Sequence, residues 1–275
     1  MLNNFTYSEW EKICRIISDQ FSCIRVVDIL SQPDSANWVA VKHDVEVSVG
    51  KALRFARIEN RYGIRATYFF QADLLPRSAG AISEIAKMGH EIAYHYDVLD
   101  SSKGDMEVAA KDFSKNLRLF EKIGFSVKTV CPHGNPLMER DGWKSNKDFF
   151  RSDLVKEKFP GIFDVIVNGE EIIVNGHGYV SDAGYAWKEI KSICDNDTVP
   201  GEDVPLEGTA GLLRCVQSHP RIIISSHPHR WSRSALRARL KVFIFVVAKK
   251  SALYLSRNRV FHRIFSRYYY LARRI

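Results

Sequence analysis

The sequence lacks the features of membrane-spanning proteins, of proteins held by disulfides or structural zinc, and of secreted proteins. Its longest apolar run, Val242–Ala248, has seven residues, whereas a helix that crosses a bilayer needs about 20. The five cysteines form no Cys-x-x-Cys pair, which argues against a disulfide framework and a structural zinc knuckle and favours a reducing compartment. The first 12 residues carry polar and acidic side chains instead of the apolar core of a secretion signal. We therefore expect a cytoplasmic protein.

Acidic residues are missing from the last quarter of the chain. No aspartate or glutamate follows Glu207, whereas 15 lysine and arginine residues do. The first 207 residues hold the other 25 basic residues and all 32 acidic ones, a net charge of −7. A mildly acidic body with a strongly basic end indicates an anionic partner, for which membrane lipid, nucleic acid and an acidic glycan are the alternatives.

The basic end, residues 232–275, interleaves its arginines and lysines with aliphatic and aromatic residues. This pattern is typical of a helix that lies on the anionic inner face of a membrane, and we favour that peripheral attachment. The alternative is a final helix of the domain followed by a solvated end. Nucleic acid is the weaker alternative, because no nucleic-acid-binding fold accompanies the charge.

Apolar strands alternate with amphipathic helices along most of the chain, and glycines stand at the joints. The expected strands cover Val39–Val47, Arg65–Gln71, His90–Tyr96, Phe125–Cys131, Phe163–Val167, Glu171–Val174 and Arg221–Ser226. The expected helices cover Tyr7–Phe21 with Ser8 as N-cap, Val47–Tyr62, Ala79–Met88, Asp105–Ile123 and Gly208–Ser218, with irregular segments at Pro132–Lys158 and Asp195–Glu207. The alternation predicts an α/β fold with a parallel sheet or barrel.

The strand Val39–Val47 is the centre of this pattern, because it begins apolar and ends in charge. Asp44 and Glu46 lie two residues apart, so both carboxylates project from one face if the strand extends that far. Two such carboxylates repel each other unless a cation or a shared proton lies between them. The alternative is a strand that simply ends in solvated residues.

Histidines and carboxylates also follow the other strands, where sites gather in α/β sheets. The third strand carries His90 and His95 and runs into Asp97, the fourth leads to His133, and the last leads to His227 and His229. A lone histidine is most often a structural residue. Imidazole and carboxylate delivered together by four strand ends suit zinc or a related divalent ion in an open catalytic site.

Five motifs, in order, resemble those of the polysaccharide deacetylase (NodB-homology) superfamily, in its branch with HDVD-type and HYE-type motifs. They are KHDVE, GHEIAYHYD, CPHGNP, DAGYAW and IIISSHPHRW, and they span Val39–Trp231. The resemblance implies a distorted (β/α) barrel of about seven strands over residues 1–231, followed by the basic helical extension. It also implies one divalent metal, zinc or else cobalt, nickel or manganese, and removal of N-acetyl groups from glycans.

The resemblance assigns a role to each matching position. Asp44 corresponds to the catalytic base, Glu46 and His95 to metal ligands, and His227 to the general acid, for which His229 is the alternative. His133 lies in the segment that helps to form the oxyanion site. The substrate-binding residues implied by these motifs are Gly134, Asp182, Trp187, His229 and Trp231. Asp182 and Trp187 have plain alternatives, as a turn cap and a core residue.

One departure from the family pattern concerns the metal. The usual second histidine, four residues after the first, is replaced by Leu99. A third ligand must come from elsewhere, and His133 is the first choice, ahead of His90 and Asp97. His90 and His95 differ by an odd number of positions and so face opposite sides of a strand, which makes His90 either structural or a residue behind the metal ligands.

The sequence therefore predicts a metal-dependent hydrolase that removes an N-acetyl group from a sugar in cell-surface glycan biosynthesis. One alternative is a hydrolase of another non-peptide C–N bond on the same barrel. The other is a non-catalytic, membrane-associated glycan-binding protein, which Leu99 keeps open.

Overall fold

The fold is built on one sheet of ten short strands. The computed structural model describes residues 5–32, 36–135, 138–168, 177–194 and 203–255, with side chains up to Val247. The strand order is β6 (Phe163–Asp164), β5 (Thr129–Pro132), β4 (Glu91–Tyr96), β3 (Thr67–Phe70), β2 (Trp38–Val45), β10 (Arg221–Ser226), β7 (Gly178–Ser181), β8 (Lys188–Glu189) and β9 (Val204–Pro205), with β1 (Ser22–Ile24) also paired to β2.

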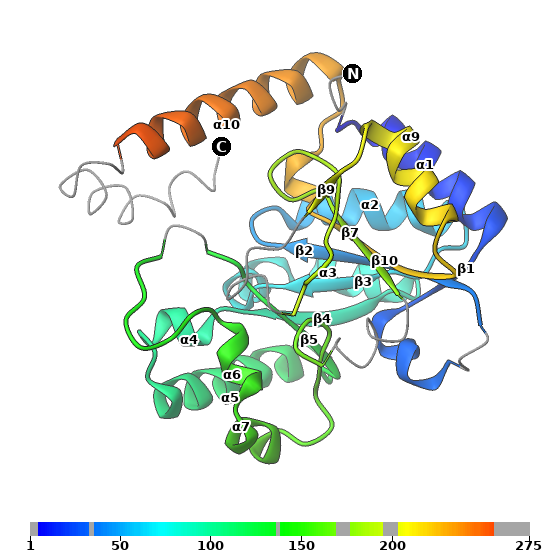
Figure 1. Ribbon diagram of the computed structural model, residues 1–275. Helices are drawn as coiled ribbons and strands as arrows, with labels where there is room; N and C mark the ends of the chain where they lie inside the picture. Colours follow the sequence, from blue (N-terminus) through cyan, green and yellow to red (C-terminus); the bar gives the residue numbers. More distant parts are fainter. Residues whose placement is uncertain (1–4, 33–35, 136–137, 169–176, 195–202, 256–275) are drawn as a thin grey trace.

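The seven strands from β6 to β7 run parallel, and β8 and β9 continue the sheet antiparallel (Figure 1). The α/β class and the parallel sheet of about seven strands are thus confirmed. Over the described ranges, no hydrogen-bonded strand pair joins the β6 and β9 edges, so the barrel is not closed by hydrogen bonds.

Strand β2 is central because it pairs with three strands along its two edges. β10 follows one edge from Trp38 to His43, while β1 and β3 share the other edge. Its side chains alternate between two apolar clusters: Val39 and Val41 enter the larger one, and Trp38 and Ala40 the smaller. This alternation decides on which face of the sheet each charged residue at the end of β2 lies.

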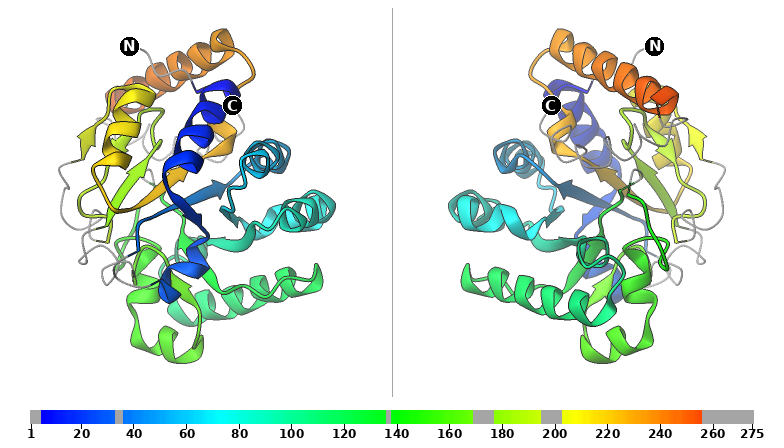
Figure 2. Two further views of the ribbon diagram at one scale, coloured as in Figure 1. Left: turned by 90° about the vertical axis from the view of Figure 1, so that its right-hand side faces the viewer. Right: turned by 90° about the vertical axis from the view of Figure 1, so that its left-hand side faces the viewer.

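Helices cover the larger apolar cluster. They are α1 (Tyr7–Gln20), α2 (Val49–Arg61), α3 (Leu75–Lys87), α5 (Met106–Lys122) and α9 (Gly208–Gln217). Helices α2, α3 and α5 follow one another along the same face of the sheet (Figure 2). Each connection between two parallel strands carries the chain back to the end of the sheet where the strands begin. All the parallel strands therefore finish at the opposite end, where their carboxyl ends lie together.

Several expected boundaries were wrong. The N-cap of α1 is Thr6, whose Oγ1 accepts a hydrogen bond from the Glu9 N–H, and Ser8 lies inside the helix. The stretch expected to be irregular contains α6 (Lys147–Arg151) and α7 (Asp153–Lys158), and β9 lies in the expected loop near its end. Short elements not foreseen are β1, β7, β8 and α4 (Val98–Ser101).

Long-range contacts explain these short elements, because a helix or strand of only a few residues is not stable by itself. The Lys147 ammonium at the start of α6, for example, donates to the Ile193 carbonyl at 2.7 Å. The strand expected at 171–174 lies outside the described residues.

The last described helix is α10 (Ala235–Leu255), which lies across the top of the molecule in Figure 1. In the described part of the chain, no helix is long and apolar enough to span a membrane.

Candidate active site

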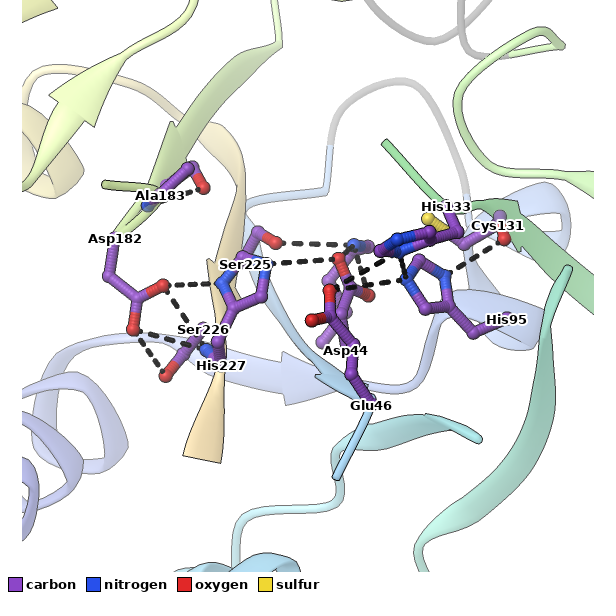
Figure 3. Close-up of polar contacts among 12 residues, drawn as sticks. Asp44, Glu46, His95, Cys131, His133, Asp182, Ala183, Ser225, Ser226 and His227 are labelled. Carbon is purple, nitrogen blue, oxygen red and sulfur yellow. Dashed lines mark hydrogen bonds and ion pairs between the residues drawn. The ribbon is translucent and has the colours of Figure 1, made fainter. Parts of the chain in front are cut away.

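Three potential metal ligands converge at the carboxyl edge of the sheet. Glu46 follows β2, His95 lies on β4 and His133 follows β5 (Figure 3). Glu46 Oε1 lies 3.3 Å from His133 Nδ1 and 3.7 Å from His95 Nε2, and the two histidine nitrogens lie 3.1 Å apart. The structure therefore brings together the third ligand chosen from the sequence and the two ligands that the family motifs imply.

The orientation of His95 fits a ligand. Its Nδ1 lies 3.0 Å from the carbonyl oxygen of Cys131, its neighbour in the β4–β5 register. Because only a protonated Nδ1 donates to a carbonyl, the neutral ring presents the Nε2 lone pair to Glu46 and His133. Two imidazoles and a carboxylate form a ligand set typical of catalytic zinc, so the residues present fit a divalent metal.

Charge at this cluster is balanced by protons in the metal-free protein. Burial raises the pKa of Glu46, but the charges of and hydrogen bonds from His133 and His95 outweigh it and hold the pKa well below its usual range. Burial lowers the pKa of His95, but the Asp44 charge and the contacts with Cys131 and Glu46 raise it to about 10. Metal binding here is therefore expected to release protons.

A second group of residues forms an acid–base pair beside the cluster. His227, directly after β10, places its Nε2 3.8 Å from Asp44 Oδ2. Its Nδ1 lies 2.6 Å from Asp182 Oδ1, directly after β7. The Asp182 carboxylate therefore holds the proton on Nδ1 and directs Nε2 towards Asp44.

Asp182 is held by donors on every side, which corrects its expected role. It accepts hydrogen bonds from the His227 N–H, the Ser226 hydroxyl at 3.1 Å and the Trp231 indole at 2.9 Å. Burial raises the pKa of Asp182, but the positive charge of His227, its hydrogen bonds and Arg230 hold it far below the usual range. Asp182 and Trp231 thus position His227 instead of contacting substrate, because both are buried and Trp231 is 1% exposed.

Lys42 belongs to the site although no role was predicted for it. It is completely buried, and its ammonium donates to both oxygens of Asp44, at 2.7 and 2.9 Å, and to Ser225 Oγ at 3.2 Å. Burial raises the pKa of Asp44, but the Lys42 charge outweighs it and the pKa falls to about 2. The period of two along β2 was the available signal, since it puts Lys42 and Asp44 on one face.

The remaining predicted substrate residues lie differently. Trp187 is 2% exposed and packs against Phe5 and Trp231, so it is a core residue and the groove prediction for it was wrong. Gly134 is exposed directly after His133. The His229 ring lies edge-on to that of His227, and burial lowers its pKa to about 3, so it is neutral at pH 7.

The other candidates are structural. His90 accepts from the Ala66 N–H through Nδ1 and bonds the Ala56 carbonyl through Nε2, on the face of the sheet opposite His95. Leu99 is buried in the larger apolar cluster. Asp97 is the residue before α4.

Within the described residues, Asp44, His95 and Cys131 form an overlapping group at the same edge, and Glu189, Cys215 and His219 form a group away from it. There the Lys191 ammonium already pairs with Glu189. We assign this group no function.

No protein-family model matches the sequence, and no curated protein matches it. Among solved structures, a family 4 carbohydrate esterase from Streptomyces lividans, in complex with acetate, is 17% identical with a TM-score of 0.46, covering 78% of this chain and 89% of that one. The catalytic domain of a peptidoglycan N-acetylglucosamine deacetylase from Eubacterium rectale is 16% identical, with a TM-score of 0.44, covering 77% and 84%.

A CE4 family pseudoenzyme from Bacillus anthracis is 13% identical, with a TM-score of 0.46, covering 78% of this chain and 63% of that one. At such low identity and TM-score the likeness carries no conclusion about activity, which depends on the side chains described above.

Proposed function

We propose that this chain is a metal-dependent hydrolase that removes an N-acetyl group from a sugar during cell-surface glycan biosynthesis. One observation carries the proposal: the Glu46, His95 and His133 ligand atoms converge beside the Asp44–His227 pair. A ligand cluster next to an ionised carboxylate and a histidine is what hydrolysis of an unactivated amide requires.

Glu46, His95 and His133 would hold the metal, zinc or else cobalt, nickel or manganese. Such an ion, when bound, polarises a carbonyl and lowers the pKa of water to about 7. The attacking water then adds to the acetyl carbon, and the C–N bond breaks to give acetate and a free amine. The backbone N–H of the exposed Gly134, next to His133, would donate to the developing oxyanion.

Asp44 would take the proton of the attacking water. Lys42 occupies two of about four lone-pair sites on this carboxylate, so acceptor capacity remains. The buried ammonium keeps Asp44 ionised and fixes its orientation, at the cost of lowering its basicity.

His227 would protonate the leaving amine through Nε2. Asp182 stabilises the charged imidazolium through the 2.6 Å contact with Nδ1, and the Trp231 indole fixes Asp182 in turn. His227 Nε2 and Asp44 Oδ2 face each other across 3.8 Å, so one substrate amide would contact both.

Elemental analysis of the purified protein tests the proposal first. We expect about one divalent metal per chain, lost in the Glu46→Ala, His95→Ala double variant, and acetate release from an N-acetylhexosamine glycan by the loaded parent only. A metal-loaded parent that releases no acetate from a panel of N-acetylated sugars would overturn it. Ring opening of cyclic amides by the same preparation, with a new carboxylate and a new amine on one product and no acetate released, would favour the other C–N hydrolase.

The non-catalytic glycan-binding alternative has a specific observation in its favour. The Lys42 ammonium already contacts both oxygens of Asp44, as it would in a purely structural ion pair. Absence of metal from the parent, even after incubation with zinc, would favour this alternative.

We also propose a cytoplasmic location with peripheral attachment to the inner face of the membrane. The support is the basic segment after Glu207, which has no acidic residue. Cell fractionation in low and high salt tests it, because electrostatic attachment weakens as salt increases.

A further inference from the structure

Helix α10 has two different faces. Ala238 is fully buried, and Lys241, Val242 and Phe245 are partly buried. These four residues follow helical spacing and form the inward face. The other described side chains from Ala235 to Val247 are exposed.

Side chains on the inward face of α10 contact residues next to the candidate active site. The Lys241 ammonium donates to the His229 carbonyl at 2.9 Å, in the turn that follows His227. The Phe245 ring lies 5.1 Å from that of Tyr185, and Tyr185 in turn lies 5.7 Å from the Arg230 guanidinium beside Asp182. Whatever the helix binds is therefore held near the carboxyl edge of the sheet.

The outward face of α10 is apolar. Of ten large hydrophobic residues exposed in the described chain, six lie on this helix, so exposure is concentrated there. Five of them recur at helical spacing and form one stripe, which we call the outward face: Leu236, Leu240, Phe243, Ile244 and Val247. Leu236 is 79% and Phe243 66% exposed, and such a contiguous apolar stripe marks an interaction surface.

The charges around the stripe identify its partner. Arg237 and Arg239 are both exposed and lie on opposite margins of the outward face by helical spacing. No acidic residue follows Glu207, so α10 carries no negative charge. An apolar stripe with basic margins matches a helix that lies in the interface of an anionic membrane.

We propose that the outward face of α10 binds an anionic membrane surface, so that the adjacent active site acts on an N-acetylated sugar carried on a lipid. The first part depends only on α10, and the second rests on the deacetylase-like function proposed above. The structure suggests this substrate class because the same helix carries the outward face and contacts the turn after His227.

Vesicle flotation of the full chain tests the first part. We expect binding to phosphatidylcholine vesicles that contain phosphatidylglycerol and little binding to phosphatidylcholine alone. Leu240→Glu with Phe243→Glu should weaken binding more than about a hundred-fold, because two apolar side chains leave the membrane. Arg237→Gln with Arg239→Gln should weaken it roughly thirty-fold.

Leu154→Glu is the matched control, since Leu154 is 75% exposed on α7. Equal loss in this control, or no preference of the parent for anionic vesicles, would overturn the proposal. A parent that is dimeric in light scattering, does not float and becomes monomeric in the Leu240→Glu, Phe243→Glu variant would show that a second copy covers the face.

Acetate release tests the second part. We compare N-acetylglucosamine linked to a lipid phosphate in anionic vesicles with soluble N-acetylglucosamine oligomers. Leu240→Glu with Phe243→Glu should lower release from the lipid-linked sugar at least ten-fold and leave release from the soluble oligomers unchanged. Release from the lipid-linked sugar at the parent level in the variant, or an equal loss on both substrates, would overturn the lipid-linked substrate. Flotation without any acetate release would refute the proposed hydrolase alone.

Discussion

The two faces of strand β2 both bury charge, and they use it differently. On the face towards α1 and α2, Glu59 accepts hydrogen bonds from His43 Nε2 at 2.6 Å, Tyr68 OH at 2.7 Å and Trp10 Nε1 at 3.1 Å. On the other face, Asp44 leads to the ligand cluster. Adjacent residues of one strand thus belong to a structural network and to a candidate active site.

The difference lies in what the polar atoms face. Around Glu59 the neighbours are donors, so its charge is satisfied within the protein. Glu46, His95 and His133 instead aim acceptor atoms at one another, and only protons or a cation resolve that arrangement. Buried charge alone therefore does not identify a site, whereas converging acceptors do.

Removing a ligand should have the largest effect on function. We expect His133→Ala to lose the metal and to lower acetate release by about three orders of magnitude or more, with little change in the free energy of unfolding. Elemental analysis and urea unfolding measure both quantities. His219→Ala, in the group beside Lys191, is the control and should keep the metal at the parent level.

Removing the carboxylate of the structural network should have the opposite signature. Glu59→Ala leaves the buried His43, Tyr68 and Trp10 donors without their acceptor, so we expect a loss of about 3–5 kcal/mol in the free energy of unfolding. Metal content per folded chain should not change. Glu59→Gln keeps one acceptor and should cost less. Loss of metal at unchanged stability would contradict the division between the two faces.

The Lys42–Asp44 pair tests whether the face of β2 that carries the candidate active site also contributes to the free energy of unfolding. Lys42→Met leaves a buried carboxylate without its counter-charge, and we expect a loss of about 3 kcal/mol. Adding Asp44→Asn removes that charge and should restore most of the loss. A double variant no more stable than Lys42→Met would show that the ammonium acts through packing against Phe69 and Tyr179 instead.

The pattern of apolar residues along the sequence was enough to predict which candidate site residues lie at the ends of strands. Apolar runs located β2, β4 and β10, and parallel strands bring Asp44, His95 and His227 to one edge. The alternation along β2 also separates His43 from Asp44, although both stood in the expected cluster of charge.

Contacts between distant residues could not be predicted in this way. Lys42 meets Ser225 across 183 positions, and Trp187 is buried by Phe5 and Trp231. The short helices α4 and α6 are joined by the Asn146 side chain, which accepts from the Asp100 N–H at 3.0 Å. No sequence window contains both partners of such a contact.

A third buried carboxylate, Asp164, sharpens the comparison because its hydrogen bonds come from neutral groups. Tyr96 OH donates to Oδ2 at 2.6 Å, and the Ile166 and Val167 N–H groups donate to Oδ1. Burial raises the pKa of Asp164 to about 6 from 3.8. The stability gained from its protonated form is fully present below about pH 4 and is lost as pH rises through 6.

Asp164→Asn isolates this effect. Between pH 4 and pH 7 the parent should lose on the order of 2–3 kcal/mol of unfolding free energy relative to the variant. Urea unfolding at several pH values measures the difference. Parallel pH profiles for the two proteins would show that Asp164 titrates normally and that neutral donors suffice to hold a buried carboxylate ionised.

The smallest expected effect concerns the helix that carries Trp10 to Glu59. Thr6 caps α1 through the Glu9 N–H at 3.3 Å, and Ser8 Oγ lies 3.0 Å from Thr6 Oγ1. Thr6→Ala should cost about 1 kcal/mol in the free energy of unfolding, and Ser8→Ala only a few tenths. Metal content should be the same in both variants, because α1 supports only the structural face of β2. Equal costs would mean that the two hydroxyls cap the helix jointly.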